Sequence, residues 1–179
     1  MKAEVTLVLG GARSGKSEVG ERLALAVGNP ITFVATGGAS EGDADWAARV
    51  ERHRERRPSS WATVEVEPGT DLGSVLGSLS GPVLLDSLGT WLAGLADLGA
   101  GGDQGVALCG GLVARRSAGH ATIVVSEEVG LGVHPSSSAG RVFRDVLGTL
   151  NRQVADLADS VLLVVAGRVL ELPEPGRGS

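Results

Sequence analysis

Cysteine, tyrosine and lysine are scarce in this chain of 179 residues. Cys109 is the only cysteine, so an intramolecular disulfide and a cysteine-rich metal site are both excluded. Tyrosine is absent, and three tryptophans and two phenylalanines leave few rings on which bases could stack. With a net charge of -5 and a pI near 5.2, the chain also lacks the basic surface that nucleic-acid binding usually needs. We therefore expect small-molecule chemistry and no nucleic-acid partner.

Long hydrophobic runs are missing as well. The longest apolar segments have the length of strands, so no membrane span is expected. The apolar run before the paired glycines Gly10 and Gly11 is too short for the core of a signal peptide. We expect a cytoplasmic protein with a single domain over residues 1–172. A frayed tail is expected over residues 173–179, where prolines and glycines have no apolar anchor.

Short β-branched and aliphatic runs alternate with segments of helical spacing. This alternation predicts an α/β fold with a mostly parallel central sheet covered by helices. The expected strands are Val5–Leu9, Ile31–Ala35, Ala62–Val66, Val83–Asp86, Thr122–Ser126 and Val161–Ala166, and the expected helices are Ser17–Val27, Ala44–Arg57, Leu88–Ala96 and Ala139–Ala158. The glycine-rich stretch Gly94–Gly111 breaks the pattern and is expected to be a loop or a loosely formed helical excursion.

The strongest motif is a glycine-rich loop between the first expected strand and the first expected helix. It reads Gly10, Gly11, Ala12, Arg13, Ser14, Gly15, Lys16 and Ser17, which is the spacing Gly-x4-Gly-Lys-Ser of a phosphate-binding loop. Glycines let the backbone curl so that successive N–H groups point at phosphate oxygens, and the helix N-terminus adds a favourable dipole. Lys16 is expected to reach the β- and γ-phosphates of a nucleoside triphosphate, and Ser17 to bind a bridging Mg²⁺ ion.

Two further observations favour a nucleotide site over a chance glycine-rich turn. The chain has only two lysines against 14 arginines, yet Lys16 stands where a slim ammonium enters the phosphate cradle. Asp86 ends the expected strand Val83–Asp86, where a carboxylate can hold magnesium directly or through water. The alternative is that Asp86, followed by Ser87, caps the next helix.

A histidine surrounded by arginines lies in the second expected helix. His53 has Arg49 and Arg56 at helical spacing, and five of the 14 arginines fall within nine positions of this segment. Cationic neighbours disfavour the imidazolium form, so a ring nitrogen stays free to attack phosphorus. The residues alone leave a second interpretation open, in which the helix is solvated and His53 packs beside Trp46 and Val50.

Taken together, these residues resemble the bifunctional adenosylcobinamide kinase and adenosylcobinamide-phosphate guanylyltransferase family of cobalamin synthesis. The resemblance runs through most of the chain. It covers the loop Gly10–Ser17, the segments Val34–Thr36 and Arg49–Arg54, Arg57 and Pro58 with Trp61, Glu65, Asp86, and Glu128–Gly132 with Pro135. Two positions depart from the family pattern: Glu127 stands where asparagine is expected before Glu-Val-Gly, and Gly37 follows Thr36 where another small residue is frequent. Arg52 also stands where some relatives have a second histidine, which leaves His53 unaccompanied.

The resemblance implies a P-loop NTPase (RecA-like) three-layer fold and two transfers at one nucleotide site. The aminopropanol hydroxyl of adenosylcobinamide is phosphorylated first. His53 then takes GMP from GTP as a covalent phosphoramidate and passes it to adenosylcobinamide phosphate. GTP or ATP as co-substrate, Mg²⁺ and a homotrimer are also expected. The implied nucleotide contacts are Gly10 through Ser17, Ala35, Thr36, Gly37, Arg54, Glu55, Arg56, Arg57, Glu65 and Asp86, with His53 and Lys16 catalytic and with Ser17 and Asp86 on the metal.

Two functions outside this family also fit the glycine-rich loop. One is another small-molecule P-loop kinase that performs no guanylyl transfer. The other is a regulatory protein that uses nucleotide binding or hydrolysis as a switch.

Several other polar residues keep two interpretations each. Glu127 or Glu128 could orient an acceptor hydroxyl or could begin a hydrated turn. Glu65 could accept hydrogen bonds from a guanine base or could simply face solvent. His120 is expected to border the strand that follows it, whereas His134 lies in an expected loop that could line the acceptor site.

Overall fold

The computed structural model describes residues 3–37, 57–95 and 101–174. Over these ranges one sheet has the strand order β3-β2-β4-β5-β1-β6-β7. Neighbouring strands are parallel, except that β6 and β7 form an antiparallel hairpin. The strands are β1 (Val5–Gly10), β2 (Thr32–Ala35), β3 (Ala62–Glu65), β4 (Val83–Asp86), β5 (Thr122–Glu127), β6 (Ser160–Val165) and β7 (Arg168–Glu171). The predicted α/β fold with a mostly parallel sheet is confirmed.

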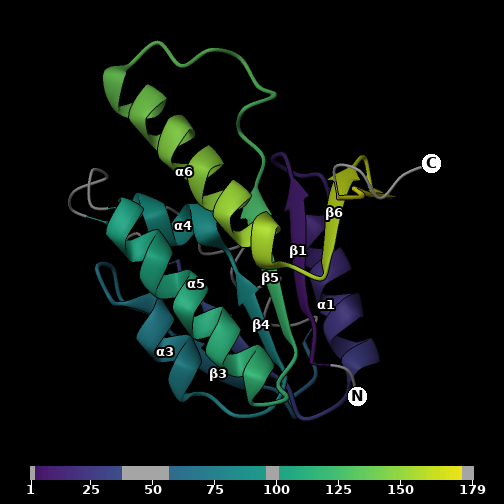
Figure 1. Ribbon diagram of the computed structural model, residues 1–179. Coiled ribbons are helices and arrows are strands. Elements are labelled where there is room, and N and C mark those ends of the chain that lie inside the picture. The colour runs from purple at the N-terminus through teal and green to yellow at the C-terminus, as the bar shows by residue number, and fades with distance from the viewer. Residues whose placement is uncertain (1–2, 38–56, 96–100, 175–179) are drawn as a thin grey trace.

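Helices pack on both faces of the sheet (Figure 1). They are α1 (Lys16–Val27), α3 (Leu72–Ser78), α4 (Leu88–Ala93), α5 (Gly101–Ser117) and α6 (Ser138–Leu157). Side chains alternate along each strand, so Leu7 joins a core cluster with residues of α3, α4, α5 and α6, whereas Val8 joins a second cluster with residues of α1. The described residues therefore form three layers, with the sheet between two layers of helices. None of the helices within the described ranges is long and apolar enough to cross a membrane.

The predicted strands agree with the structure to within a residue or two at their ends, and so do the predicted helices Ser17–Val27 and Ala139–Ala158. The predicted helix Leu88–Ala96 is too long, because α4 ends at Ala93 and Gly94 caps it. The fourth, Ala44–Arg57, falls outside the described residues except for its last position. The sequence patterns did not reveal two elements, the short helix α3 and the strand β7. Both are short, and every residue of β7 is exposed, so neither has a strong hydrophobic period.

The prediction of a loop or loose excursion over Gly94–Gly111 is wrong for its second half, because α5 begins at Gly101 and continues to Ser117. Glycine lowers helix propensity, but here it permits close packing of α5 on α3. A Cβ atom at Gly111 would overlap the carbonyl oxygen of Gly73, and a Cβ atom at Gly73 would overlap the carbonyl oxygen of Ala107. Tertiary contact therefore outweighs the local preference.

A buried arginine joins α5 to the end of α3. The side chain of Arg115 is 1% exposed. Its guanidinium donates hydrogen bonds to the carbonyl oxygens of Leu79 (2.6 Å) and Gly81 (2.6 Å) and to the hydroxyl of Thr122 (2.9 Å). Burial lowers the pKa of Arg115 to about 10, so the side chain stays charged at neutral pH. These hydrogen bonds give partners to backbone carbonyl groups in the turn that joins α3 to β4.

Candidate nucleotide site

The glycine-rich loop occupies the gap between the last residue of β1, Gly10, and the first residue of α1, Lys16. Arg13 and Gly15 have left-handed backbone, with φ angles of 57° and 93°, and such residues curl successive N–H groups toward one side. A Cβ atom at Gly10 would overlap the Ser14 hydroxyl and lie 2.9 Å from the Val164 carbonyl oxygen. Glycine is therefore required at position 10 for the loop to pack against β6.

Lys16 is held inside the loop, with only 4% of its surface exposed. Its Nζ atom donates to the carbonyl oxygen of Gly11 at 3.5 Å and lies 3.4 Å from the Oε1 atom of Glu127. Ser17, the next residue, is also buried in the first turn of α1. The loop thus places an ammonium and a hydroxyl at the N-terminus of a helix, which is where phosphate binds in this class of loop.

The sheet brings other polar residues to the same edge. In the parallel ladders, Ala35 pairs with Asp86 and Gly10 pairs with Glu127. Because β2, β4, β5 and β1 are consecutive in the sheet, the carboxyl ends of these strands meet at one edge. This is the edge where open parallel α/β sheets bind ligands. Thr36, Asp86, Glu127 and the glycine-rich loop therefore share one site.

A hydrogen-bond network links Glu127 to the start of α4. The Ser87 hydroxyl donates to both carboxylate oxygens of Glu127, at 2.9 and 3.0 Å, and the backbone N–H of Gly89 donates to Oε2 at 3.0 Å. Ser87 also caps α4 in a capping box with Thr90. The helix cap is therefore Ser87 rather than Asp86, which ends β4 one residue earlier.

Thr36 and Asn151 fix the backbone on either side of this network. The Thr36 hydroxyl donates to the Ser87 carbonyl oxygen at 2.6 Å and accepts from the Ser87 N–H at 2.9 Å. The Asn151 amide on α6 donates to the Glu127 carbonyl oxygen at 3.0 Å and accepts from the Ser126 hydroxyl at 2.6 Å. These roles of Ser87 and Asn151 were not predicted, because no motif marks them. The position of Glu127 at a strand end was the available signal.

The structure collects only part of the predicted nucleotide set. Gly10 through Ser17, Ala35 to Gly37 and Asp86 lie at or beside the loop edge. Arg57 packs over the ring of Phe33 on β2, with its guanidinium carbon 3.6 Å from the ring centroid. Glu65 is exposed at the end of the outermost strand, β3. His53, Arg54, Glu55 and Arg56 lie outside the described residues.

The two other histidines occupy different settings. His120 accepts a hydrogen bond from the N–H of Gly81 through Nδ1 at 3.3 Å, just before β5, which fits the expectation that it borders this strand. His134 lies in the loop between β5 and α6, and its Nδ1 atom is 2.8 Å from a guanidinium nitrogen of Arg144. His134 is therefore joined to α6.

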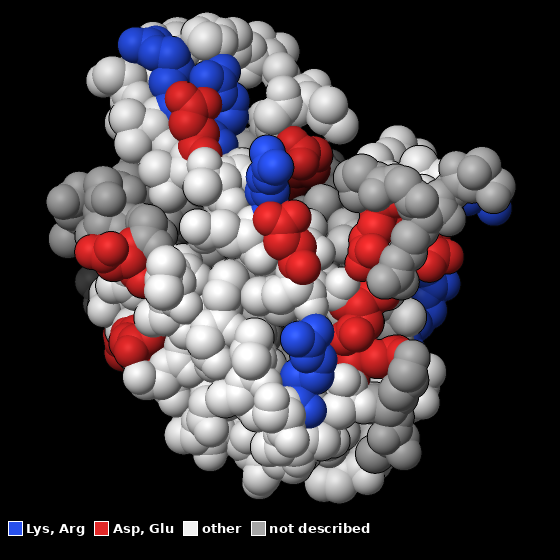
Figure 2. Space-filling view, in the orientation of Figure 1, with Lys and Arg blue, Asp and Glu red and all other residues white. Residues whose placement is uncertain are grey.

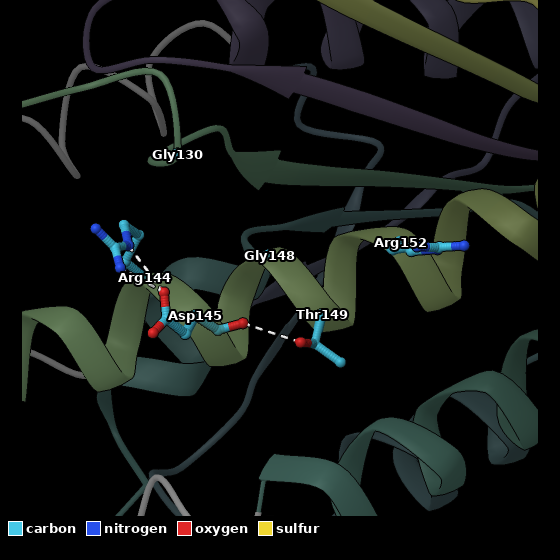
Figure 3. A pocket seen from close by; sticks show the side chains of 6 residues that line it. All are labelled: Gly130, Arg144, Asp145, Gly148, Thr149 and Arg152. Atoms are coloured by element: carbon cyan, nitrogen blue, oxygen red, sulfur yellow. Dashed lines mark hydrogen bonds and ion pairs between the residues drawn. The ribbon is translucent and has the colours of Figure 1, made fainter.

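A hollow of about 490 Å³ lies between α6 and the loop that follows β5 (Figure 3). Its lining consists of Gly130, Arg144, Asp145, Gly148, Thr149 and Arg152. Arg144 forms an ion pair with Asp145 at 2.7 Å, and Figure 2 shows basic side chains gathered over the outer part of α6. Gly130, which lines the hollow, is two residues after Glu128 in the chain. The N–H of Glu128 donates a hydrogen bond of 3.1 Å to the carbonyl oxygen of Gly10. The hollow is thus close in sequence to the loop edge.

A curled glycine-rich loop with a buried lysine, at the carboxyl edge of a parallel sheet, defines a P-loop nucleotide-binding α/β protein. The model of the family described as "Cobinamide kinase / cobinamide phosphate guanyltransferase" matches residues 6–172. The chain belongs to this family.

Three relatives cover nearly the whole chain. The bifunctional adenosylcobalamin biosynthesis protein CobP of Pseudomonas aeruginosa is 37% identical over 180 residues, which are 96% of each protein. The bifunctional adenosylcobalamin biosynthesis proteins CobU of Escherichia coli and Salmonella typhimurium are 33% and 30% identical, and each alignment covers 90% of this chain and 95% of the relative.

Proposed function

We propose that this chain is a transferase that phosphorylates the aminopropanol hydroxyl of adenosylcobinamide and then transfers GMP from GTP to the product, giving adenosylcobinamide-GDP. The observation that carries the proposal is Lys16, buried in the curled loop at the sheet edge where Asp86 and Glu127 also end their strands. Membership of the cobinamide kinase and guanyltransferase family over residues 6–172 supplies the substrate class.

In the kinase step the acceptor oxygen bonds to the γ-phosphorus of ATP or GTP, and the bond from that phosphorus to the β–γ bridging oxygen breaks. The nucleoside diphosphate leaves, and the acceptor hydroxyl loses its proton. Lys16 and the loop N–H groups stabilise the charge on the transferred group. Ser17 and Asp86 offer the hard oxygen ligands that Mg²⁺ prefers, and the bound ion would neutralise charge on the β- and γ-phosphates.

In the guanylyl step a ring nitrogen of His53 attacks the α-phosphorus of GTP, and pyrophosphate leaves. A phosphate oxygen of adenosylcobinamide phosphate then attacks the same phosphorus and releases His53. We assign the other nucleotide contacts to Ala35, Thr36, Gly37, Glu65 and the segment Arg54, Glu55, Arg56 and Arg57. The stacking of Arg57 on Phe33, two residues before Ala35, supports a place for Arg57 beside β2.

We place the acceptor beside the loop edge, in the hollow lined by Arg144 and Arg152. Guanidinium groups suit the phosphate monoester that the first step makes. The neighbouring loop exposes Leu131 by 80% and Val133 by 95%, which would suit burial against a second subunit. We therefore propose that the chain forms a homotrimer in which subunits close around the acceptor. We also propose that the protein works in the cytoplasm, where ATP and GTP are supplied.

The test is to incubate the purified protein with adenosylcobinamide, Mg²⁺ and ATP, and then with GTP, and to follow the corrinoid by mass spectrometry. We expect a product that has gained one phosphoryl group, followed by one that has also gained GMP. The Lys16→Ala variant should lose both reactions. Phosphorylation without GMP transfer would identify a kinase of narrower function, and nucleotide binding without any transfer would identify a regulatory protein.

A further inference from the structure

We infer that Glu127 competes with phosphate for the ammonium of Lys16 and thereby limits how tightly the glycine-rich loop holds triphosphate and pyrophosphate. The inference rests on the proposed function in one respect, since it takes the loop as the triphosphate site. It assigns to Glu127 a positioning role that acts through Lys16.

The carboxylate of Glu127 is built into the site. It lies 3.4 Å from Lys16 Nζ and accepts hydrogen bonds from the Ser87 hydroxyl and the Gly89 N–H. Glycine at position 89 makes room for it, because a Cβ atom there would overlap Oε2 of Glu127. The side chain is thus held in place from β5, α4 and the loop at the same time.

Phosphate oxygens and the carboxylate need the same partner. Lys16 is only 4% exposed, so its ammonium has little water to replace a lost contact. When phosphate takes the ammonium, Ser87 and Gly89 still hold Glu127 in place, and its negative charge stays beside the phosphates. Like charges at this range repel each other, and the repulsion is stronger away from bulk water. The carboxylate therefore weakens phosphate binding and recovers Lys16 as phosphate leaves.

This competition has a consequence for turnover. Both proposed steps leave a phosphorylated product in the loop, a nucleoside diphosphate or pyrophosphate, and release of product limits many well-evolved enzymes. A carboxylate that recovers Lys16 favours release. A neutral side chain at this position would neither repel phosphate nor recover Lys16, so this chain should hold pyrophosphate more weakly than a variant with a neutral side chain there.

The variant Glu127→Gln removes the charge and keeps an oxygen that can accept from Ser87 and Gly89. Titration calorimetry should give a dissociation constant for GTP and for inorganic pyrophosphate about tenfold lower than in the unaltered protein, the change that a difference of about 1.4 kcal/mol produces. The matched control is Glu128→Gln. Glu128 is the adjacent carboxylate, and its Oε1 atom accepts from the N–H of Gly130 at 2.7 Å. The dissociation constants of this control for both probes should stay within about twofold of those of the unaltered protein, because the carboxylate of Glu128 is not the one that contacts Lys16.

A second variant tests the same contact without removing a charge. Gly89→Ala introduces the Cβ atom that would overlap Glu127 Oε2 and should displace the carboxylate from Lys16, so GTP and pyrophosphate should again bind more tightly. Thermal melts show which variants are folded before binding is measured, and either folded variant decides the question.

Unchanged or weaker affinity in a folded Glu127→Gln or Gly89→Ala variant would overturn the inference, as would equal tightening in Glu128→Gln, which indicates a general charge effect. A fall in kinase turnover with an unchanged GTP affinity would also overturn it, by placing the role of Glu127 at the acceptor. If the unaltered protein and Lys16→Ala both fail to bind GTP, it is the proposed nucleotide site that fails.

Discussion

The backbone N–H of Gly167 donates a hydrogen bond of 2.8 Å to the carbonyl oxygen of Ser14. Gly167 is in the turn of the β6–β7 hairpin, where Ala166 and Gly167 have φ angles of 50° and 73°, and Ser14 is in the middle of the phosphate-binding loop. The exposed turn of this hairpin therefore braces the loop from outside the motif.

Replacing Gly167 by alanine should weaken nucleotide binding without removing any phosphate ligand. No atom blocks a Cβ at this position, but alanine in left-handed backbone costs roughly 1–2 kcal/mol, and relief of that strain should shift the turn away from Ser14. We expect the GTP dissociation constant to rise about fivefold, the equivalent of about 1 kcal/mol. Gly119→Ala is the control, since its φ of 85° and open surroundings impose the same strain away from the loop. Equal GTP affinity in both variants would contradict the bracing role.

Two adjacent glycines of α5 should respond oppositely to alanine. At Gly111 a Cβ atom would overlap the carbonyl oxygen of Gly73, whereas at Gly110 it would meet no atom within 4 Å. Gly111→Ala should lower the free energy of unfolding by about 3 kcal/mol, because backbone of α3 would have to move. Gly110→Ala should raise it by roughly 0.5–1 kcal/mol through helix propensity. Urea denaturation of both variants measures the difference, and similar values would show that α3 and α5 are not in close contact.

Arg115 should matter more for stability than its neighbour Arg116. Arg115→Met leaves the part-buried carbonyl oxygens of Leu79 and Gly81 without their donor, and we expect a loss of about 3 kcal/mol. Arg116→Met removes a partly exposed contact to the Leu157 carbonyl oxygen and should cost less than about 1 kcal/mol.

The effect of Arg115→Met should not change between pH 7 and pH 9. Burial lowers the pKa of Arg115 only to about 10, so over this range the side chain keeps its proton in the folded protein and in the unfolded chain. The free energy of unfolding then has no pH slope from this group. Chemical denaturation at the two pH values checks this, and a difference that grows toward pH 9 would mean that the folded-state pKa lies lower.

The sequence was sufficient to predict the strands β1 to β6, their parallel arrangement and the phosphate-binding loop, because each depends on a local pattern. Val5–Gly10 is an almost continuous apolar run, which is typical of a strand buried on both faces. The helix α5 could not be predicted this way. Its glycines oppose helix formation locally, and the contact with Gly73 that stabilises the helix pairs residues far apart in the chain.

Within the site, the motif identified Lys16 and Ser17 but not the residues that hold Lys16. Glu127 was interpreted as a carboxylate that could orient an acceptor hydroxyl or begin a hydrated turn. Its contact with Lys16 depends on the register that pairs it with Gly10. The role of Ser87 depends in the same way on the neighbouring positions of β4 and β5. Long-range register of this kind is a property of the assembled sheet.

The central claim is that His53 carries GMP between GTP and the acceptor. The most direct measurement is to incubate the protein with GTP labelled at the α-phosphate, denature it at neutral pH, and locate the label by peptide mass spectrometry. We predict a GMP group on His53 that is lost in acid, absent in His53→Ala, and retained in His120→Ala and His134→Ala. A protein that binds GTP but carries no adduct, or carries it on another residue, would contradict the account.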